Sequence, residues 1–183
     1  MRELSLHLLD IAENSIAAGA RNITIEINEN SKVDLLKLMV IDDGRGMDEE
    51  TVKKVIDPFV TSRTTRKVGL GIPLLKEAAE ACNGSLTITS EIGKGTEIVV
   101  TFQRSHIDRM PLGDIATTFL NLLVANPQIH WIFNYAADDQ EFQLDDREIK
   151  DVIGNILLTE PDIIGFLREL IKNGIEQVQN KKY

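Results

Sequence analysis

The sequence is poor in several features, and each shortage excludes a class of protein. Only one of its 183 residues is cysteine, which excludes an internal disulfide framework and a metal site of clustered cysteines. No apolar run is long enough to span a bilayer, and the N-terminus lacks the basic start and unbroken apolar core of a secretory signal. Cations are also in deficit, because 20 Lys and Arg face 29 Asp and Glu, a net charge of −9. We therefore expect a cytoplasmic protein that does not bind nucleic-acid phosphates in a sequence-independent way.

What remains is the composition of an ordinary globular protein. Hydrophobic residues make up 43% of the chain and charged residues 27%, close to the averages for such proteins. The length allows one medium domain and a small one. Because the residue pattern loosens between Gln103 and Pro111, we predict a boundary there. It separates an N-terminal domain of residues 1–104 from a small C-terminal α+β domain of residues 105–183.

Hydrophobic periodicity and capping residues predict the elements of both parts. In the first part we expect helices over residues 2–18, 49–56 and 72–83, with Gly19 ending the first and Asp48 capping the second. Strands are expected over residues 22–28, 36–41, 86–91 and 96–103, the last two forming a hairpin. In the second part we expect a helix from Asp114 to residue 125, a hairpin of residues 128–135 and 141–144, and helices over residues 146–153 and from Pro161.

The first predicted helix combines an apolar stripe with a cluster of polar side chains. Asp10, Glu13 and Asn14 share one face, because residues three and four apart are neighbours on a helix. A carboxylate and an amide that face an apolar interior need a polar partner. A hydrated Mg²⁺ holding a nucleoside triphosphate would supply one, since Mg²⁺ takes oxygen ligands and keeps several waters. The alternative is an amphipathic helix with its polar side in water.

Two glycine-containing loops follow strands or open helices. Gly44 and Gly46 lie just after the buried strand that ends at Asp42, and they predict a tight loop where the backbone approaches another group closely. The turn Gly69-Leu70-Gly71 opens a helix, whose free N–H groups and positive dipole end suit phosphate. Residues 60–68 between them are predicted to form a polar loop whose cations are Arg63, Arg66 and Lys67.

Three separated motifs occur in a familiar order, namely Asp10-x-x-x-Asn14, Asp42-x-Gly44-x-Gly46 and Gly69-x-Gly71. Together they resemble the ATP-binding domain shared by gyrase, the ninety-kilodalton heat-shock chaperone, histidine kinases and MutL, the GHKL superfamily. The resemblance covers roughly the first 104 residues. It implies an α+β fold, a two-layer α/β sandwich of the Bergerat type, with a mostly antiparallel sheet, helices on one face and a small α+β C-terminal extension. It also implies a stand-alone form without an upstream phosphoacceptor helix.

The resemblance implies roles for the motif residues. Asn14 would hold Mg²⁺ through its amide oxygen, Asp42 would accept the adenine amino group, and Thr96 would support that end of the base. Ile41 and Met47 would supply apolar walls to the base. The full set implied to bind ATP is Asn14, Ala17, Asp42, Gly44, Gly46, Met47, Lys67, Gly69, Leu70, Gly71 and Thr96.

One position departs from the family pattern. Members that hydrolyse ATP efficiently usually place a glutamate four residues before the asparagine, where this chain has Asp10. Its shorter side chain still accepts a proton, so Asp10 as general base is a hypothesis, with Glu13 as the alternative catalytic carboxylate. ATP binding is the firmer prediction and fast hydrolysis is not predicted.

The histidines carry less information. The segment from His106 to Leu112 partly matches the phosphoacceptor box of histidine kinases, but it lacks the acid after the histidine and directly follows a strand. We interpret it as a coincidence. His7 is expected to pack at the rim of the site and His130 to be structural, because three scattered histidines do not make a metal site.

The sequence therefore predicts a Mg²⁺-dependent ATP-binding protein, either a histidine-kinase-like ATPase or a protein kinase in signalling. The alternative is an ATP-controlled protein-interaction switch with little turnover, in which ATP orders residues 60–68 and the C-terminal part contacts a partner. A degenerate docking domain is a weaker third choice, since Asn14, Asp42 and both glycine loops are retained. A protein partner or phosphoacceptor and a homodimer stay open, and neither nucleic acid nor membrane is expected as a partner.

Overall fold

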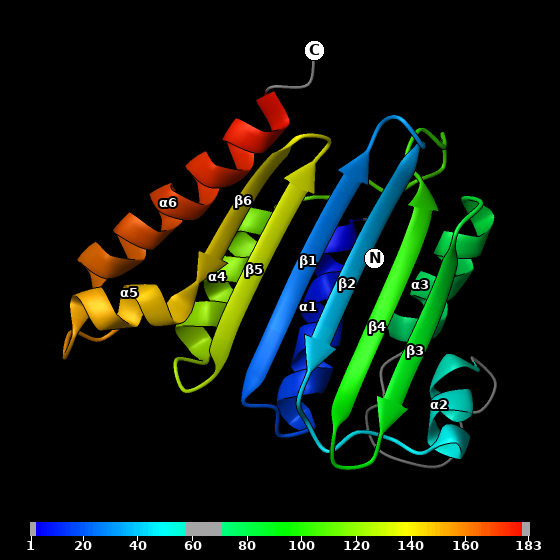
Figure 1. Ribbon diagram of the computed structural model, residues 1–183, viewed down its shortest axis with the longest axis horizontal. Coiled ribbons are helices and arrows are strands. Elements are labelled where there is room, and N and C mark those ends of the chain that lie inside the picture. Colours follow the sequence, from blue (N-terminus) through cyan, green and yellow to red (C-terminus); the bar gives the residue numbers. More distant parts are fainter. Residues whose placement is uncertain (1–2, 58–70, 181–183) are drawn as a thin grey trace.

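The computed structural model describes residues 3–57 and 71–180, which form a sheet covered by helices (Figure 1). All the predicted elements are found, with ends that differ by a few residues from those predicted. The strands are β1 (Asn22–Asn30), β2 (Leu35–Asp42), β3 (Ser85–Glu91), β4 (Gly95–Gln103), β5 (His130–Ala137) and β6 (Gln140–Asp145). The helices are α1 (Leu4–Ala17), α2 (Glu49–Ile56), α3 (Gly71–Ala81), α4 (Ile115–Ala125), α5 (Asp146–Ile153) and α6 (Pro161–Asn180).

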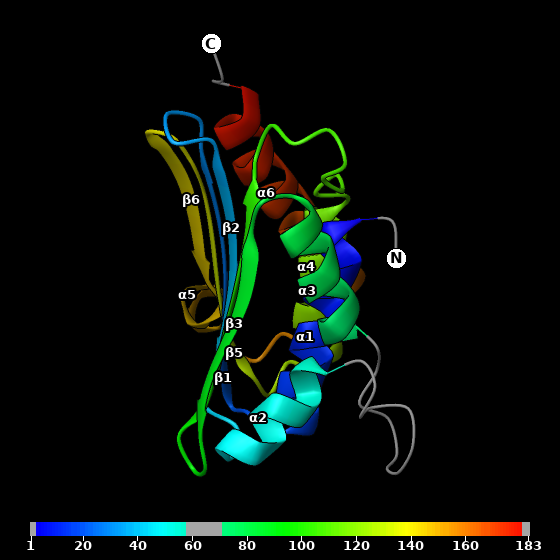
Figure 2. The same cartoon turned by 90° about the vertical axis from the view of Figure 1, so that its right-hand side faces the viewer.

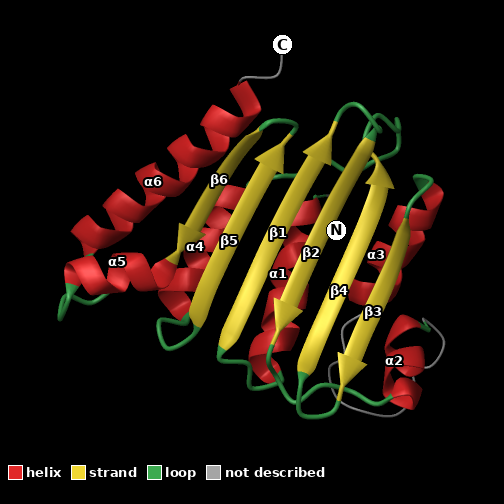
Figure 3. Cartoon of the chain, in the orientation of Figure 1, coloured by secondary structure: helices red, strands yellow, loops and turns green. Residues whose placement is uncertain are grey.

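The six strands form one mixed sheet in the order β3-β4-β2-β1-β5-β6 (Figure 3). Neighbours pair antiparallel except β1 and β5, which run parallel. Helices α1, α3, α4 and α6 lie on one face of the sheet, whereas α5 lies at the end of β6 outside that layer (Figure 2). The predicted α+β two-layer sandwich is therefore confirmed.

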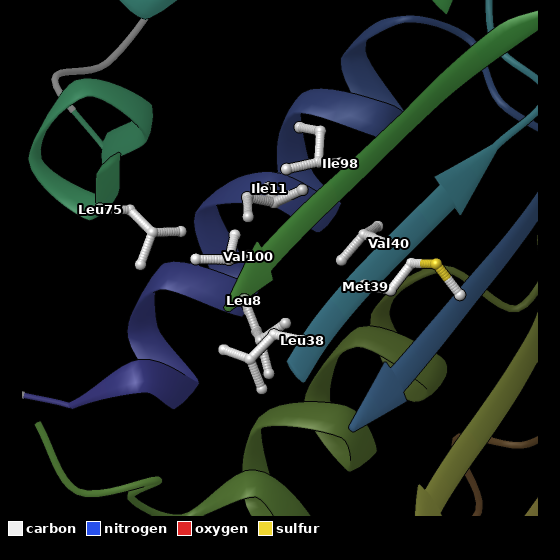
Figure 4. Close-up of a pocket in the computed structure, with 8 residues that line it drawn as sticks. All are labelled: Leu8, Ile11, Leu38, Met39, Val40, Leu75, Ile98 and Val100. Carbon is white, nitrogen blue, oxygen red and sulfur yellow. The ribbon is translucent and has the colours of Figure 1, made fainter. Parts of the chain in front are cut away.

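The core lies between the helix layer and one face of the sheet. Burial alternates along β2, as expected when one side of a strand meets helices and the other does not. Figure 4 shows Leu8 and Ile11 of α1 and Leu75 of α3 directed toward Leu38 of β2 and Val100 of β4. All five side chains are almost fully buried. This interior is apolar, so it fixes the position of α1 on the sheet without itself offering polar groups.

The sheet continues across the predicted boundary near residue 104. Strand β5 pairs with β1 in parallel register, with Phe133 opposite Ile25. Helix α4 covers this half, where the ring of Phe119 stacks on Phe133 at a centroid distance of 4.7 Å and meets Trp131 edge-on at 6.3 Å. Whether residues 105–183 fold as a separate domain stays a prediction. In the described part of the chain, no helix combines the length and the apolar character needed to cross a bilayer.

Candidate functional site

A cavity of about 350 Å³ opens where α1 ends, β2 ends and β4 begins. These ends meet because β2 and β4 pair with Asp42 opposite Thr96, and α1 packs across β2. Six of the residues predicted to bind ATP line the cavity: Asn14, Ala17, Asp42, Gly46, Met47 and Thr96. The remaining lining residues are mostly apolar: Ile11, Ser15, Ala18, Arg45, Val55, Ile72 and Ile98.

Asp42 is the buried carboxylate of this cavity, with 9% of its surface exposed. Its Oδ2 accepts a hydrogen bond of 2.6 Å from the Ser15 hydroxyl, and its Oδ1 accepts one of 2.9 Å from the Gly44 N–H. A carboxylate offers about four lone-pair sites. Asp42 is thus held in a fixed orientation and keeps capacity to accept a further donor inside the cavity.

Ser15 also belongs to the site, although no motif in the sequence indicates it. It is 4% exposed, and its hydroxyl faces both Asp42 and the Ile11 carbonyl, at 3.3 Å. Serine inside a helix commonly bonds the carbonyl four residues earlier, a role that needs no contact outside α1. Only the packing of α1 on the end of β2 brings Asp42 within reach.

On the opposite wall of the cavity, the hydroxyl groups of Ser90 and Thr96 hold the loop that follows β2. The Thr96 and Ser90 hydroxyls are 2.9 Å apart, and the Met47 N–H donates to the Ser90 oxygen at 2.8 Å. Ser90 also donates to the Gly95 carbonyl at 2.9 Å. The loop that carries Met47 is therefore tied to the β3–β4 hairpin, and Thr96 stands opposite Asp42 in the pairing of β2 with β4.

Gly46 has a structural reason to be glycine. Its φ is +65°, and an added Cβ would lie 1.9 Å from the Glu91 carbonyl oxygen. A Cβ at Gly44 would lie 2.9 Å from the Cβ of Ala18. Both glycines thus let the loop after β2 approach neighbouring protein, whether or not a ligand is near.

The three polar residues of α1, Asp10, Glu13 and Asn14, lie in different surroundings. Asn14 lines the cavity, whereas Asp10 and Glu13 do not. Glu13 is exposed to solvent and so is the side chain of Asn14, while Asp10 is half-buried. Of the two interpretations of this cluster, the solvent-facing one describes Glu13, whereas Asn14 borders both solvent and the cavity.

Asp10 lies against the N-terminus of α3. A Cβ added to Gly71 would lie 2.4 Å from Asp10 Oδ2, so the end of the Asp10 side chain is next to the first residue of α3. His7, one turn earlier, is 2% exposed and hydrogen-bonds the Gly71 backbone. Burial lowers the pKa of His7, although Asp10 and that hydrogen bond act in the opposite direction. His7 therefore packs beside the start of α3 and does not line the cavity.

Some of the residues predicted from the sequence to bind phosphate cannot be placed. Lys67, Gly69 and Leu70 lie outside the described residues, as do Arg63 and Arg66.

Ile41 was expected to form a wall, but this expectation is wrong. It alternates with the buried Asp42 along β2 and so lies on the opposite face of the sheet. The cavity instead takes its apolar surface from Ile11, Ile72 and Ile98.

His106 lies beyond the far end of β4. Thr96 lines the cavity at the start of that strand, and at about 3.3 Å per residue the strand carries the chain about 23 Å away by Gln103. There the Asp108 N–H donates to His106 Nδ1 at 3.2 Å. This local turn contact and the distance support the interpretation of the partial motif as a coincidence.

Comparison with known proteins decides the family. The model for histidine kinase-, DNA gyrase B- and HSP90-like ATPases matches residues 2–106. The chain belongs to this family. The matched region contains the whole cavity lining, and the family's ATPase domain accounts for α1 to α3 and β1 to β4.

Relatives within the family are larger proteins. Sporulation kinase D of Bacillus subtilis is 33% identical over 97 residues, which are 51% of this chain and 18% of that protein. The sensor histidine kinase WalK of the same organism is 38% identical over 85 residues, 44% of this chain and 14% of WalK. A putative NtrY-like sensor histidine kinase of Rickettsia felis is 29% identical over 108 residues, 59% of this chain and 18% of that protein. The chain thus spans less than a fifth of each relative.

Solved structures give more distant likenesses. The Aquifex aeolicus MutL ATPase domain, complexed with ADP, is 13% identical with a TM-score of 0.49, and the match covers 100% of this chain and 99% of that one. The catalytic domain of the histidine kinase ThkA is 21% identical with a TM-score of 0.44, covering 57% of this chain and 68% of that one.

Proposed function

We propose that this family member binds ATP with Mg²⁺ in the cavity between α1 and the ends of β2 and β4. The observation that carries the proposal is the buried Asp42 carboxylate, oriented by Ser15 and Gly44 in a cavity that Asn14 also lines. Its volume of about 350 Å³ falls within the range of small-molecule sites, about 300–1,000 Å³.

The donors of the site fit a magnesium ion. Mg²⁺ prefers oxygen ligands, takes few from protein and keeps several waters. Among the lining residues that the structure describes, Asn14 offers an amide oxygen near solvent, and no histidine or cysteine is present to favour a softer metal. Bound there, Mg²⁺ would neutralise charge on the phosphates of the nucleotide.

Asp42 would select the base. A carboxylate that is held by two donors and still has free lone pairs accepts the amino group of adenine, whereas the carbonyl of guanine at that place would repel it. Thr96, braced by Ser90, stands beside it and can hydrogen-bond the same edge. Met47, Ile98 and Ile72 supply apolar contact for the ring.

Calorimetric titration of the full chain with ATP and GTP, each with and without Mg²⁺, tests the proposal. Losing a hydrogen bond to a charged group costs about 1.5–3 kcal/mol, so Asp42→Asn should weaken ATP binding about tenfold to a hundredfold. Asn14→Ala should remove the dependence on Mg²⁺. The matched control is Asp139→Asn, an exposed carboxylate in the β5–β6 turn. If neither site variant differs from this control, the assignment of the cavity is wrong.

Turnover is a separate part of the proposal. We infer that Asp10 acts as general base in a histidine-kinase-like ATPase or kinase, because it lies one turn before Asn14 and against the start of α3. Steady-state phosphate release by Asp10→Asn should fall at least tenfold while ATP affinity is kept. Unchanged release would exclude Asp10, and the same assay on Glu13→Gln tests the alternative.

An ATP-controlled interaction switch is the second candidate. The observation that favours it is that Asp42 is the only carboxylate among the described residues lining the cavity. ATP labelled in the γ-phosphate distinguishes the functions. Label on protein supports a kinase, free phosphate supports an ATPase, and tight binding with neither supports a switch.

A further inference from the structure

Three side chains with metal-ligating atoms meet at the C-terminal strands. His130 begins β5, Asp145 ends β6, and Asp146 begins α5. One ligand atom from each lies within 4.8 Å of the others. We propose that His130, Asp145 and Asp146 bind one divalent ion of the zinc type. The sequence offered no metal spacing here, because Asp145 and Asp146 join His130 only when β5 and β6 pair.

Asp146 supplies the first observation in favour of a bound cation. The residue is 0% exposed, and its Oδ2 accepts from the Lys150 ammonium, which also donates to the Ile129 carbonyl at 2.9 Å. Its Oδ1 is buried and has no hydrogen-bond partner in the structure as described. That atom lies 3.9 Å from His130 Nε2. A buried acceptor without a partner costs free energy, and a cation between these two atoms would remove that cost.

His130 is already arranged as metal-binding histidines are. Its Nδ1 lies 2.9 Å from Asn22 Oδ1. The Asn22 amide is itself fixed, because its Nδ2 donates to Asp43 at 2.6 Å and its Oδ1 accepts from Arg147 at 3.3 Å. Nδ1 therefore donates to Asn22, and Nε2 faces the two aspartates, where it shares a hydrogen bond of 2.8 Å with Asp145 Oδ1 that a bound ion would replace. Such an outer contact is the usual way to set the tautomer of a ligating histidine.

The spacing and chemistry of the three ligands suit zinc. Ligands about 2.0–2.1 Å from a tetrahedral ion lie about 3.3 Å from one another. The distances from His130 Nε2 are 2.8 Å to Asp145 Oδ1 and 3.9 Å to Asp146 Oδ1, on either side of that value. An imidazole with two carboxylates favours zinc-like ions over Mg²⁺ and Ca²⁺. The Asp145 side chain is 30% exposed, which gives an ion a way in and leaves room for water as a fourth ligand.

The ion would join β5, β6 and α5 at one point. Helix α5 lies outside the layer formed by the other helices of the fold (Figure 2), and the three proposed ligands come from the places where these elements begin or end. We therefore assign the ion a structural role, holding the start of α5 to the end of the hairpin.

Titrating the nucleotide-free chain of residues 1–183 with Co²⁺ and Zn²⁺ tests the site. We expect one Co²⁺ per chain with the strong visible absorption of a four-coordinate ion, displaced by Zn²⁺ and not by Mg²⁺. Asp146→Asn and His130→Gln should each weaken binding at least about tenfold, and Asn22→Ala about 10–100-fold through the lost outer contact. The matched control is Asp151→Asn, an exposed carboxylate on α5, which should bind like the wild-type chain.

Asn14→Ala should also bind Co²⁺ normally, which separates this site from the proposed ATP site. The proposal is overturned if the wild-type chain gives no four-coordinate Co²⁺ spectrum. It is likewise overturned if Asp146→Asn or His130→Gln binds as tightly as Asp151→Asn. In either case His130 serves only as an ion-pair partner of the two aspartates. Since the wild-type spectrum decides alone, a variant that fails to fold does not weaken the test.

Discussion

At the scale of single residues, the orientation of the Asp42 carboxylate depends on the hydroxyl group of Ser15. Ser15 is the side chain that satisfies Asp42 Oδ2, and both residues are buried. Removing one partner of a buried hydrogen bond leaves the other desolvated and unsatisfied, at a cost of about 1–3 kcal/mol. The stability of the fold and the orientation of the proposed base-binding carboxylate are therefore linked through the same contact.

We predict that Ser15→Ala lowers the free energy of unfolding by about 1–3 kcal/mol, measured by urea denaturation without nucleotide. Thr117→Ala, which removes an exposed hydroxyl from α4, should change it much less. Equal effects of the two substitutions would contradict the importance of the Ser15–Asp42 bond.

His7 gives a prediction about pH. Its pKa in the folded protein is lowered from 6.5 by burial, so below about pH 6.5 the unfolded chain binds more protons than the folded chain. Stability is then fully present above that pH and is lost as pH falls toward the folded-state pKa. We expect His7→Gln to reduce this loss when melting temperature is measured from pH 7.5 to 5.

The control for this experiment is His106→Gln, at the turn beyond β4. It should keep the wild-type dependence on pH, because the hydrogen bonds of His106 lie within its own turn, to Gln103, Asp108 and Arg109. If both variants follow the wild-type curve, the charge state of His7 does not contribute to stability over this range.

At the scale of elements, the β3–β4 hairpin holds the loop after β2 in place. Gly46 approaches the Glu91 carbonyl so closely that any side chain must displace one of the two. Gly93, in the turn of the same hairpin, also has a positive φ, +79°, but an added Cβ there meets nothing within 4 Å. A substitution at Gly93 therefore causes backbone strain alone, whereas one at Gly46 causes both strain and a clash.

We predict that Gly93→Ala costs about 1 kcal/mol of stability through its left-handed conformation alone. Gly46→Ala should cost clearly more and should also weaken ATP binding, because the loop carries Met47 into the cavity. Urea denaturation and calorimetry on both variants measure the difference. Equal costs would mean that the loop moves freely away from the hairpin.

At the scale of the whole molecule, one sheet joins the family domain to the C-terminal part. Residues 105–183 supply β5 to the edge of β1 and α4 to the side of α1. Without them β1 becomes an edge strand with unpaired backbone groups, and the apolar surface facing α4 is uncovered. The predicted division at residue 104 is therefore open to a direct test.

We predict that a fragment of residues 1–104 unfolds at a lower urea concentration than the full chain, binds a hydrophobic dye and self-associates. Urea denaturation, dye fluorescence and sedimentation measure these properties. An unchanged midpoint and a monomeric fragment would instead support two independent domains.

Much of this molecule follows from local patterns that a sequence carries. The alternation of Ile23, Ile25 and Ile27 predicts a strand with one buried face, and Asp48 and Asp114 predict helix starts, because capping and periodicity are properties of neighbouring residues. Both aspartates accept the expected N–H bonds, from Thr51 and Thr117. The ordered motifs of the first 104 residues were likewise enough to identify the family.

By itself, then, the sequence determined the elements, the α+β class, the family and six of the thirteen residues that line the cavity. Tertiary structure alone decided that Ser15 holds Asp42, that Ile41 faces away from the cavity, and that β5 extends the sheet beside β1. It also brought His130 to Asp145 and Asp146. These outcomes depend on which strands pair and which side of α1 meets the sheet, and contacts between residues far apart in the chain leave no periodic signal in the sequence.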